Sequence, residues 1–91
     1  FLESAGTWSP DSKRFAFDVY EKGQSVLIIK DIFKTNKTKK IKIPGVPAFS
    51  NPSWSPDGKT IVVSGLVHGQ TDLYAYHLKS KKVKLKRNLP N

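Results

Sequence analysis

The sequence has no cysteine and no methionine among its 91 residues. Without cysteine the chain can form no disulfide bond, no thiolate metal site and no thiol nucleophile. There is no run of about 18 apolar residues, so we expect no membrane-spanning helix. A basic start followed by an apolar stretch is also missing, so we expect no signal peptide within these residues. Because the chain starts at Phe1 and lacks methionine, we expect a processed or excised segment of a longer protein.

Sequence motifs of the common catalytic and metal sites are absent as well. No glycine-rich phosphate loop occurs, and no serine stands in the strand-turn-helix context of a nucleophile elbow. Ser64, His68 and Asp72 have the residue types of a catalytic triad, but no segment near them could form an oxyanion site. His68 and His77 do not have the spacing of zinc ligands. The sequence therefore predicts no catalytic residue, no metal site and no cofactor, and a protein that is not an enzyme.

Positive charge is in excess, with 16 lysine and arginine residues against 7 aspartate and glutamate residues and a net charge of +9. Such a balance permits binding to nucleic acid, to an anionic membrane or to an acidic partner. It is equally expected of a solvated surface whose lysines prevent sheet edges from pairing with other chains. The positions of the lysines therefore matter more than their number.

The chain is organised by an internal repeat. Trp8–Lys13 (Trp-Ser-Pro-Asp-Ser-Lys) returns as Trp54–Lys59 (Trp-Ser-Pro-Asp-Gly-Lys), at an offset of 46 residues. An apolar triplet follows both copies, and a Gly-Gln pair follows both triplets. The offset changes to 42 where Lys39 aligns with Lys81, which predicts four extra residues in the basic turn of the first copy. The aspartate of each Trp-Ser-Pro-Asp turn is expected to bind nearby backbone N–H groups rather than a metal.

Each copy contains four segments whose composition predicts β-strands. The expected strands are Ser4–Trp8, Phe15–Tyr20, Val26–Ile32 and Ile41–Ile43 in the first copy, and one ending at Trp54, Thr60–Gly65, Asp72–Leu78 and Val83–Lys86 in the second. The proline-rich segment Pro44–Pro52 predicts a connection between the copies and excludes a helix or a central strand there. No segment has ten residues of helical periodicity. The predicted fold class is therefore all-β, with two tandem four-stranded antiparallel units.

Tandem four-stranded units of about 40 to 50 residues are typical of β-propeller blades. Trp54–Lys59, the apolar triplet Ile61–Val63 and the segment Gly69–Tyr74 (Gly-Gln-x-Asp-Leu-Tyr) resemble the WD-repeat-like blade of TolB-type propellers. Similar blades occur in the propeller domains of prolyl-oligopeptidase-like and tricorn-like peptidases. We assign residues 1–45 to a first propeller blade and residues 46–91 to a second. Since two blades make an incomplete propeller, we expect a fragment of a longer propeller or a chain that self-associates.

The resemblance to propellers sorts the turns onto two faces. Turns that join the first to the second strand and the third to the fourth strand are expected on one face, which then carries most of the lysines. The candidate anion-binding residues on that face are Lys34, Lys37, Lys39, Lys40, Lys79, Lys81 and Lys82. The opposite face is chemically more varied, and its candidates for binding a partner are Tyr20, Glu21, Gln24, His68 and Gln70. No aromatic residue alternates with the lysines, so the bases of a nucleic acid have no evident stacking platform.

The resemblance favours a non-enzymatic protein-interaction scaffold, which in the TolB-like case would be periplasmic or secreted. One alternative is that the blades belong to the propeller of a peptidase and control access to a catalytic domain outside this chain. Another is the binding of a polyanion, either a nucleic acid or a glycan, through the lysine-rich face. The expected partners are thus a protein, further propeller blades of a parent chain or other copies of this chain.

Overall fold

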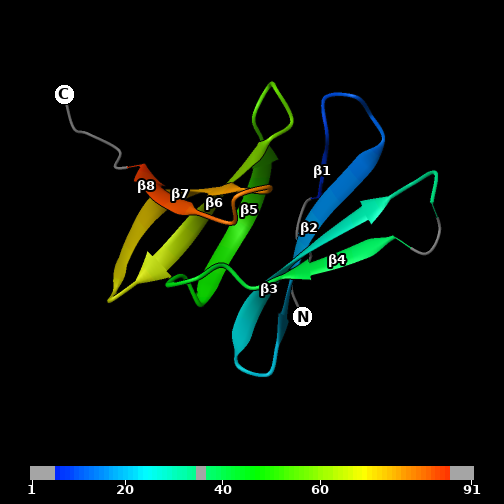
Figure 1. Ribbon diagram of the computed structural model, residues 1–91. Helices are drawn as coiled ribbons and strands as arrows, with labels where there is room; N and C mark the ends of the chain where they lie inside the picture. The colour runs from blue at the N-terminus through cyan, green and yellow to red at the C-terminus, as the bar shows by residue number, and fades with distance from the viewer. Residues whose placement is uncertain (1–5, 35–36, 87–91) are drawn as a thin grey trace.

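The computed structural model describes residues 6–34 and 37–86, which form two antiparallel β-sheets of four strands each (Figure 1). The first sheet contains β1 (Thr7–Trp8), β2 (Arg14–Glu21), β3 (Gln24–Asp31) and β4 (Thr38–Ile41). The second sheet contains β5 (Ala48–Trp54), β6 (Thr60–Val67), β7 (Gln70–His77) and β8 (Val83–Lys86). Within each sheet every strand pairs with the next one along the chain, which confirms the predicted all-β fold with two tandem four-stranded units. The described part of the chain contains no helix long and apolar enough to cross a membrane.

One hydrophobic core lies between the two sheets. Ala16 of β2 is opposite Ile29 of β3, Ile61 of β6 is opposite Tyr76 of β7, and all four side chains are buried. The buried members of the core are Ala16, Leu27, Ile29, Ile43, Val46, Phe49, Ile61, Val63 and Tyr76. Full burial of one large aliphatic side chain, such as that of Ile61, stabilises a fold by about 1.5–3 kcal/mol. Because successive side chains of a strand alternate between its faces, each sheet also has an outward face that this core does not use.

Polar contacts fix the position of the second sheet on the first. The backbone N–H of Ser25 in β3 donates to the carbonyl oxygen of Pro47 (2.7 Å), and Ser25 Oγ accepts from the backbone N–H of Phe49 (2.9 Å). Ser25 is buried, so these bonds satisfy polar groups that water does not reach. At the far end of β5, Nε1 of Trp54 donates to the carbonyl oxygen of Thr7 in β1 (3.1 Å). The junction is therefore held at both ends of β5.

The two Trp-Ser-Pro-Asp turns are built in the same way. In the first turn Ser9 Oγ donates to the carboxylate of Asp11 (2.5 Å) and accepts from the backbone N–H of Arg14 (3.0 Å). In the second turn Ser55 Oγ repeats both bonds, to Asp57 at 2.6 Å and from the following strand at 3.1 Å. Each aspartate also accepts a backbone N–H two residues further on, at 3.0 Å in both turns. The prediction that these aspartates cap their turns is confirmed.

Strand β5 corrects the predicted connection. The sequence predicts that the connection extends over Pro44–Pro52, whereas β5 already begins at Ala48. A bulge interrupts the register of β5 against β6 around Asn51, whose φ is +55°. Because β5 is an edge strand of its sheet and is bulged, it can continue through Pro52, which has no N–H to donate.

The fourth strands correct the predicted insertion. Lys39 of β4 and Lys84 of β8 lie opposite the same position in the third strand of their sheets, so Lys84, and not Lys81, is the structural counterpart of Lys39. The turns before them comprise residues 32–37 and 78–82, so the first turn is longer by one residue instead of four. The alignment at an offset of 42 matched similar runs of lysine and not equivalent strand positions.

Two further strand predictions differ from the structure in their bounds. The fourth strand of the first sheet was placed by composition at Ile41–Ile43, but it lies at Thr38–Ile41, and Ile43 is a buried residue of the connection. The first strand is predicted from Ser4, which lies outside the described residues, and β1 covers Thr7–Trp8. The division of the chain into two blades after residue 45 stays a prediction.

Candidate functional site

At one end of each sheet the lysine-rich turn between the third and fourth strands contacts the turn between the first and second strands. In the first sheet the backbone N–H of Ile32, which begins the β3–β4 turn, donates to the carbonyl oxygen of Lys13 in the β1–β2 turn (2.9 Å). In the second sheet the N–H of Leu78 makes the matching bond to the carbonyl oxygen of Lys59 (3.0 Å). Figure 1 shows the β2–β3 and β6–β7 hairpin turns at the opposite, lower end of the molecule. Each sheet thus has two basic turns at one end and its central hairpin turn, β2–β3 or β6–β7, at the other.

A cavity of about 330 Å³ lies at the basic end, where the first sheet meets the β7–β8 turn of the second. Its charged lining comes from the first sheet and its β3–β4 turn, and consists of Arg14, Asp31, Lys34, Lys37 and Lys39. Ile29 and Thr38 of the first sheet and Leu78 of the second complete the lining. Three of the predicted anion-binding lysines are therefore brought together around one cavity.

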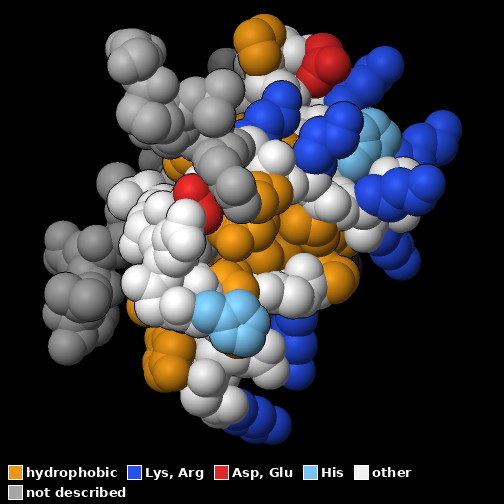
Figure 2. All heavy atoms as spheres, turned by 90° about the vertical axis from the view of Figure 1, so that its left-hand side faces the viewer, with side chains coloured by type: hydrophobic (Ala, Val, Ile, Leu, Met, Phe, Trp, Pro, Cys, Tyr) orange, Lys and Arg blue, Asp and Glu red, His pale blue; other side chains and the backbone are white. Residues whose placement is uncertain are grey.

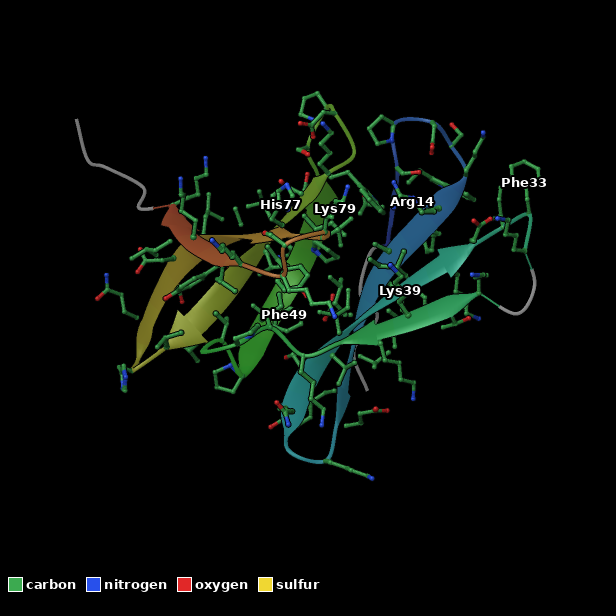
Figure 3. All side chains as sticks on the ribbon, in the orientation of Figure 1. Arg14, Phe33, Lys39, Phe49, His77 and Lys79 are labelled. Atoms are coloured by element: carbon green, nitrogen blue, oxygen red, sulfur yellow. The ribbon has the colours of Figure 1, made fainter. Side chains whose placement is uncertain are left out.

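The register of the first sheet explains how this lining is formed. Arg14 is opposite Asp31 in the β2–β3 pair, and Ile29 is opposite Lys39 in the β3–β4 pair. These four positions share the sheet face that carries Ala16 in the core, because they are an even number of residues apart along their strands. Figure 3 shows Arg14 and Lys39 on the side of the first sheet that is turned toward the second. The cavity is therefore the charged end of the same interface whose middle is apolar.

Arg14 is held in place by the second sheet. Its guanidinium carbon lies 4.6 Å from the centre of the Trp54 ring, in a cation–π contact, and its Nη2 donates to the carbonyl oxygen of Gly58 (3.3 Å). A guanidinium has five N–H donors, so these contacts leave others available to a bound anion. Arg14 joins the two sheets and also presents fixed positive charge to the cavity.

Among residues 6–34 and 37–86, no carboxylate lies within 4 Å of a lysine of the cavity, and the ion pair in this part of the chain joins Lys40 to Glu21 (3.6 Å). The carboxylate in the lining, that of Asp31, accepts the backbone N–H of Phe33 through Oδ1 (2.9 Å). The cavity therefore combines four cationic side chains with one carboxylate. Such a surplus of positive charge attracts an anion.

The other predicted anion-binding residues do not line this cavity, and they are Lys40, Lys79, Lys81 and Lys82. Lys40 is paired with Glu21, and the other three belong to the β7–β8 turn (Figure 3). In that turn the ring nitrogen Nδ1 of His77 accepts the backbone N–H of Ser80 (3.2 Å), much as Asp31 accepts a backbone N–H in the first sheet. The two basic turns are thus capped by different side chains and present their lysines separately.

The predicted partner-binding residues lie in two separate hairpin turns. Tyr20, Glu21 and Gln24 surround the β2–β3 turn, and His68 and Gln70 belong to the β6–β7 turn. Both turns have two central residues with positive φ, between +52° and +82°, as type I′ hairpin turns require. Each sheet contributes one part of this surface, and its role in binding a partner stays a prediction.

The residues that resemble a catalytic triad are not assembled. In the β6–β7 pair Ser64 is opposite Leu73, whereas Asp72 is opposite Gly65. The side chains of Ser64 and Asp72 therefore point to opposite faces of the sheet. Within the described ranges no group of three or more His, Asp or Glu side chains is placed to hold a metal ion.

Sequence analysis alone placed Arg14 at the basic end but not among the anion-binding candidates, and it did not single out Asp31 or Thr38. The repeat does distinguish Arg14 and Asp31, because the matching positions of the second copy hold the different residues Thr60 and His77. A charged residue that the second copy lacks is a candidate for a role specific to the first sheet. The contribution of Leu78 could not be found in this way, since it depends on how the two sheets pack.

Comparison with known proteins agrees with this architecture. No protein-family model matches the sequence. The chain is 35% identical over 77 residues to the Tol-Pal system protein TolB of Ruthia magnifica subsp. Calyptogena magnifica, which covers 84% of this chain and 18% of that protein. It is 31% identical over 74 residues to the TolB of Vesicomyosocius okutanii subsp. Calyptogena okutanii (strain HA), covering 80% of this chain and 17% of that protein.

A solved structure extends the likeness to the fold. The crystal structure of TolB from Acinetobacter baumannii matches 92% of this chain and 21% of its own, with a TM-score of 0.77 and 27% sequence identity. The chain spans about a fifth of the length of the TolB proteins that it resembles. The predicted resemblance to peptidase propellers stays a prediction. In sequence and in fold, this chain is similar to a segment of a TolB-type β-propeller in which two four-stranded sheets stand side by side.

Proposed function

We propose that this chain forms part of a TolB-like β-propeller that binds another protein and catalyses no reaction. The observation that carries the proposal is the similarity to TolB, which extends over 84% of the chain in sequence and 92% in structure. Because the relatives are named as Tol-Pal system proteins, the partner that we propose is a further protein of such a system. A periplasmic or secreted location is part of the same proposal.

The proposed contact surface consists of the β2–β3 and β6–β7 hairpin turns. Tyr20, next to the first turn, is 70% exposed, and exposed aromatic side chains are enriched among the residues that contribute most to protein interfaces. Lys22 and His68 each have a φ of +52° within their type I′ turns, so the shape of both turns exists before a partner arrives. Preformed turns lower the entropy cost of binding.

Calorimetric titration of the chain with the purified Pal protein of the same organism tests this proposal. We expect saturable binding that Tyr20→Ala weakens about tenfold, since loss of one central aromatic contact commonly costs more than about 1 kcal/mol. Phe33→Ala is the matched control, because Phe33 is equally exposed (71%) but lies in the β3–β4 turn at the basic end. An equal loss in both variants would contradict the proposed surface, and absence of binding by the unmodified chain would contradict the proposed partner.

A further inference from the structure

Independently of the proposed protein binding, we propose that the cavity at the basic end binds a small organic phosphate, a phosphate monoester that carries a compact apolar group. The proposal rests on four cationic side chains around one cavity, on the absence of an ion pair to any of them among the described residues, and on the apolar residues beside them.

The charge and the donors of the cavity match a phosphate monoester. Arg14 supplies a planar guanidinium whose position is set by Trp54 and Gly58, and Lys34, Lys37 and Lys39 supply flexible ammonium groups. A phosphate monoester carries a charge of about −1.5 to −2 at neutral pH and three strongly accepting oxygens. Charge-assisted hydrogen bonds to such oxygens are roughly twice as strong as neutral ones. Four cations against one carboxylate leave enough positive charge to balance the ligand.

Backbone hydrogen bonds join the described residues on both sides of the β3–β4 turn. The N–H of Asp31 donates to the carbonyl oxygen of Lys37 (3.2 Å), and the N–H of Lys37 donates to that of Lys34 (2.9 Å). The N–H of Lys34 in turn donates to the carbonyl oxygen of Asp31 (3.3 Å). These bonds hold the backbone of Lys34 and Lys37 on one side of the cavity, which lowers the entropy cost of binding.

The size and the apolar lining indicate a ligand larger than phosphate itself. The volume of about 330 Å³ is at the lower end of the range of small-molecule sites, which is about 300–1,000 Å³. One water molecule occupies about 30 Å³ of liquid, so inorganic phosphate would fill a small part of this space. Ile29 of β3 and Leu78 of the second sheet offer apolar contact to the rest of the ligand, and Thr38 adds a hydroxyl group.

The second copy of the repeat lacks two charged residues of the cavity, Arg14 and Asp31. Arg14 and Asp31 correspond to Thr60 and His77 at the repeat offset of 46, and the second sheet has the same strand order with these residues. The β7–β8 turn is closed by a bond from the backbone N–H of Ser80 to His77 in place of a carboxylate. Arg14 is therefore specific to the first sheet, whereas Lys39 has a lysine, Lys84, at the equivalent position of the second sheet.

Titration of the ¹⁵N-labelled chain with phenyl phosphate in about 0.15 M salt, followed by NMR, tests the proposal. Phenyl phosphate has the required dianion and an apolar ring, and this salt concentration screens diffuse attraction between exposed charges. We expect saturable shifts of the amide signals of Lys37, Thr38 and Lys39, and weaker shifts from inorganic phosphate at the same concentration. Lys39→Ala is expected to weaken phenyl phosphate binding about tenfold, the effect of losing one charge-assisted contact.

Lys84→Ala is the matched control, because Lys84 is the structural counterpart of Lys39 in the second sheet and its removal changes the net charge equally. We expect this variant to change the affinity less than twofold. Equal weakening by both variants, or shifts that do not saturate, would show diffuse attraction only and overturn the site. Equal affinities for phenyl phosphate and inorganic phosphate would overturn the assignment of an apolar group. Failure of the proposed Pal binding would leave all of these outcomes unaffected, since that surface is at the opposite end of the sheets.

Discussion

Asp11 and Asp57 occupy the same position in two copies of one turn, and both have a pKa below the ordinary carboxyl value of 3.8. The largest cause is the hydrogen bond from the hydroxyl of Ser9 or Ser55, and the next is the bond from a backbone N–H. Both bonds favour the charged carboxylate. Each aspartate is thus occupied in holding its turn closed, which explains its presence without a metal or a catalytic role.

At the residue scale we predict that Ser9→Ala raises the pKa of Asp11 and leaves the pKa of Asp57 unchanged. Removal of the hydroxyl deletes the bond that contributes most to the lowered pKa of Asp11, and the second turn is untouched. NMR titration of both carboxyl groups in one sample measures the effect, so the repeat supplies its own control. Ser55→Ala should produce the reverse result. An unchanged Asp11 pKa would show that the hydroxyl is not the main cause.

The lowered pKa values also determine how these turns respond to acid. A carboxyl group whose pKa is lower in the folded state adds stability that is complete above its unfolded pKa, about 3.9. That contribution disappears as the pH falls through the lower folded pKa. In Ser9→Ala the folded and unfolded pKa values of Asp11 move closer together, so the free energy of unfolding should depend less on pH below about 4.

At the scale of single elements, the two Trp-Ser-Pro-Asp turns differ at one backbone position. Ser12 and Gly58 occupy equivalent places, with φ of +60° and +73°. Glycine adopts such left-handed conformations without steric cost, whereas other L-residues are disfavoured there by about 1–2 kcal/mol. Ser12 is therefore the more strained residue at this position of the turn.

We predict that Ser12→Gly stabilises the protein by about 0.5–1 kcal/mol, less than the full relief of strain, because glycine also increases the entropy of the unfolded chain. Urea denaturation measures the change. Gly58→Ala should destabilise by about 1 kcal/mol, since the added Cβ would lie 3.6 Å from Arg14 Nη2 and 3.7 Å from Pro10 Cδ, ordinary contacts that leave the backbone as the cause. A loss of stability in Ser12→Gly would contradict this account.

The sequence predicted elements where residue types restrict the backbone locally. Turn residues and β-branched residues located five of the eight strands, β2, β3, β6, β7 and β8, within about two residues of their described bounds, because alternation and turn chemistry are local properties. The sequence analysis placed β4 wrongly, because the run of lysines around Lys39 has no alternation of apolar and polar residues that would fix the register of this strand. It missed the early start of β5, because a bulge at Asn51 allows a strand to include a proline. The cavity could not be predicted, because Arg14 and Leu78 meet only when the sheets pack.

At the scale of the whole molecule, the two sheets cover each other on one side only. Trp54 is half-buried at the junction, whereas its counterpart Trp8 is 52% exposed, because no third sheet lies against the first. On the outward face of the second sheet Leu66 and Leu73 are 48% and 40% exposed. Figure 2 shows this face with apolar side chains at its centre and lysines mainly to the right of them and below them. Uncovered apolar faces of repeat units are normally covered by a neighbouring unit.

We therefore predict that the isolated chain self-associates, with the outward sheet faces taking the place of the neighbouring blades that a propeller would provide. Sedimentation at increasing concentration should show a rising average mass, and Leu73→Ser should shift this rise to concentrations at least about tenfold higher, since burial of a leucine contributes about 1.5–3 kcal/mol. Phe33→Ser is the matched control, because Phe33 is 71% exposed but lies in a turn outside both sheet faces. A chain that stays monomeric at high concentration and unfolds cooperatively would contradict the prediction, because the two sheets would then be stable with their outer faces in water.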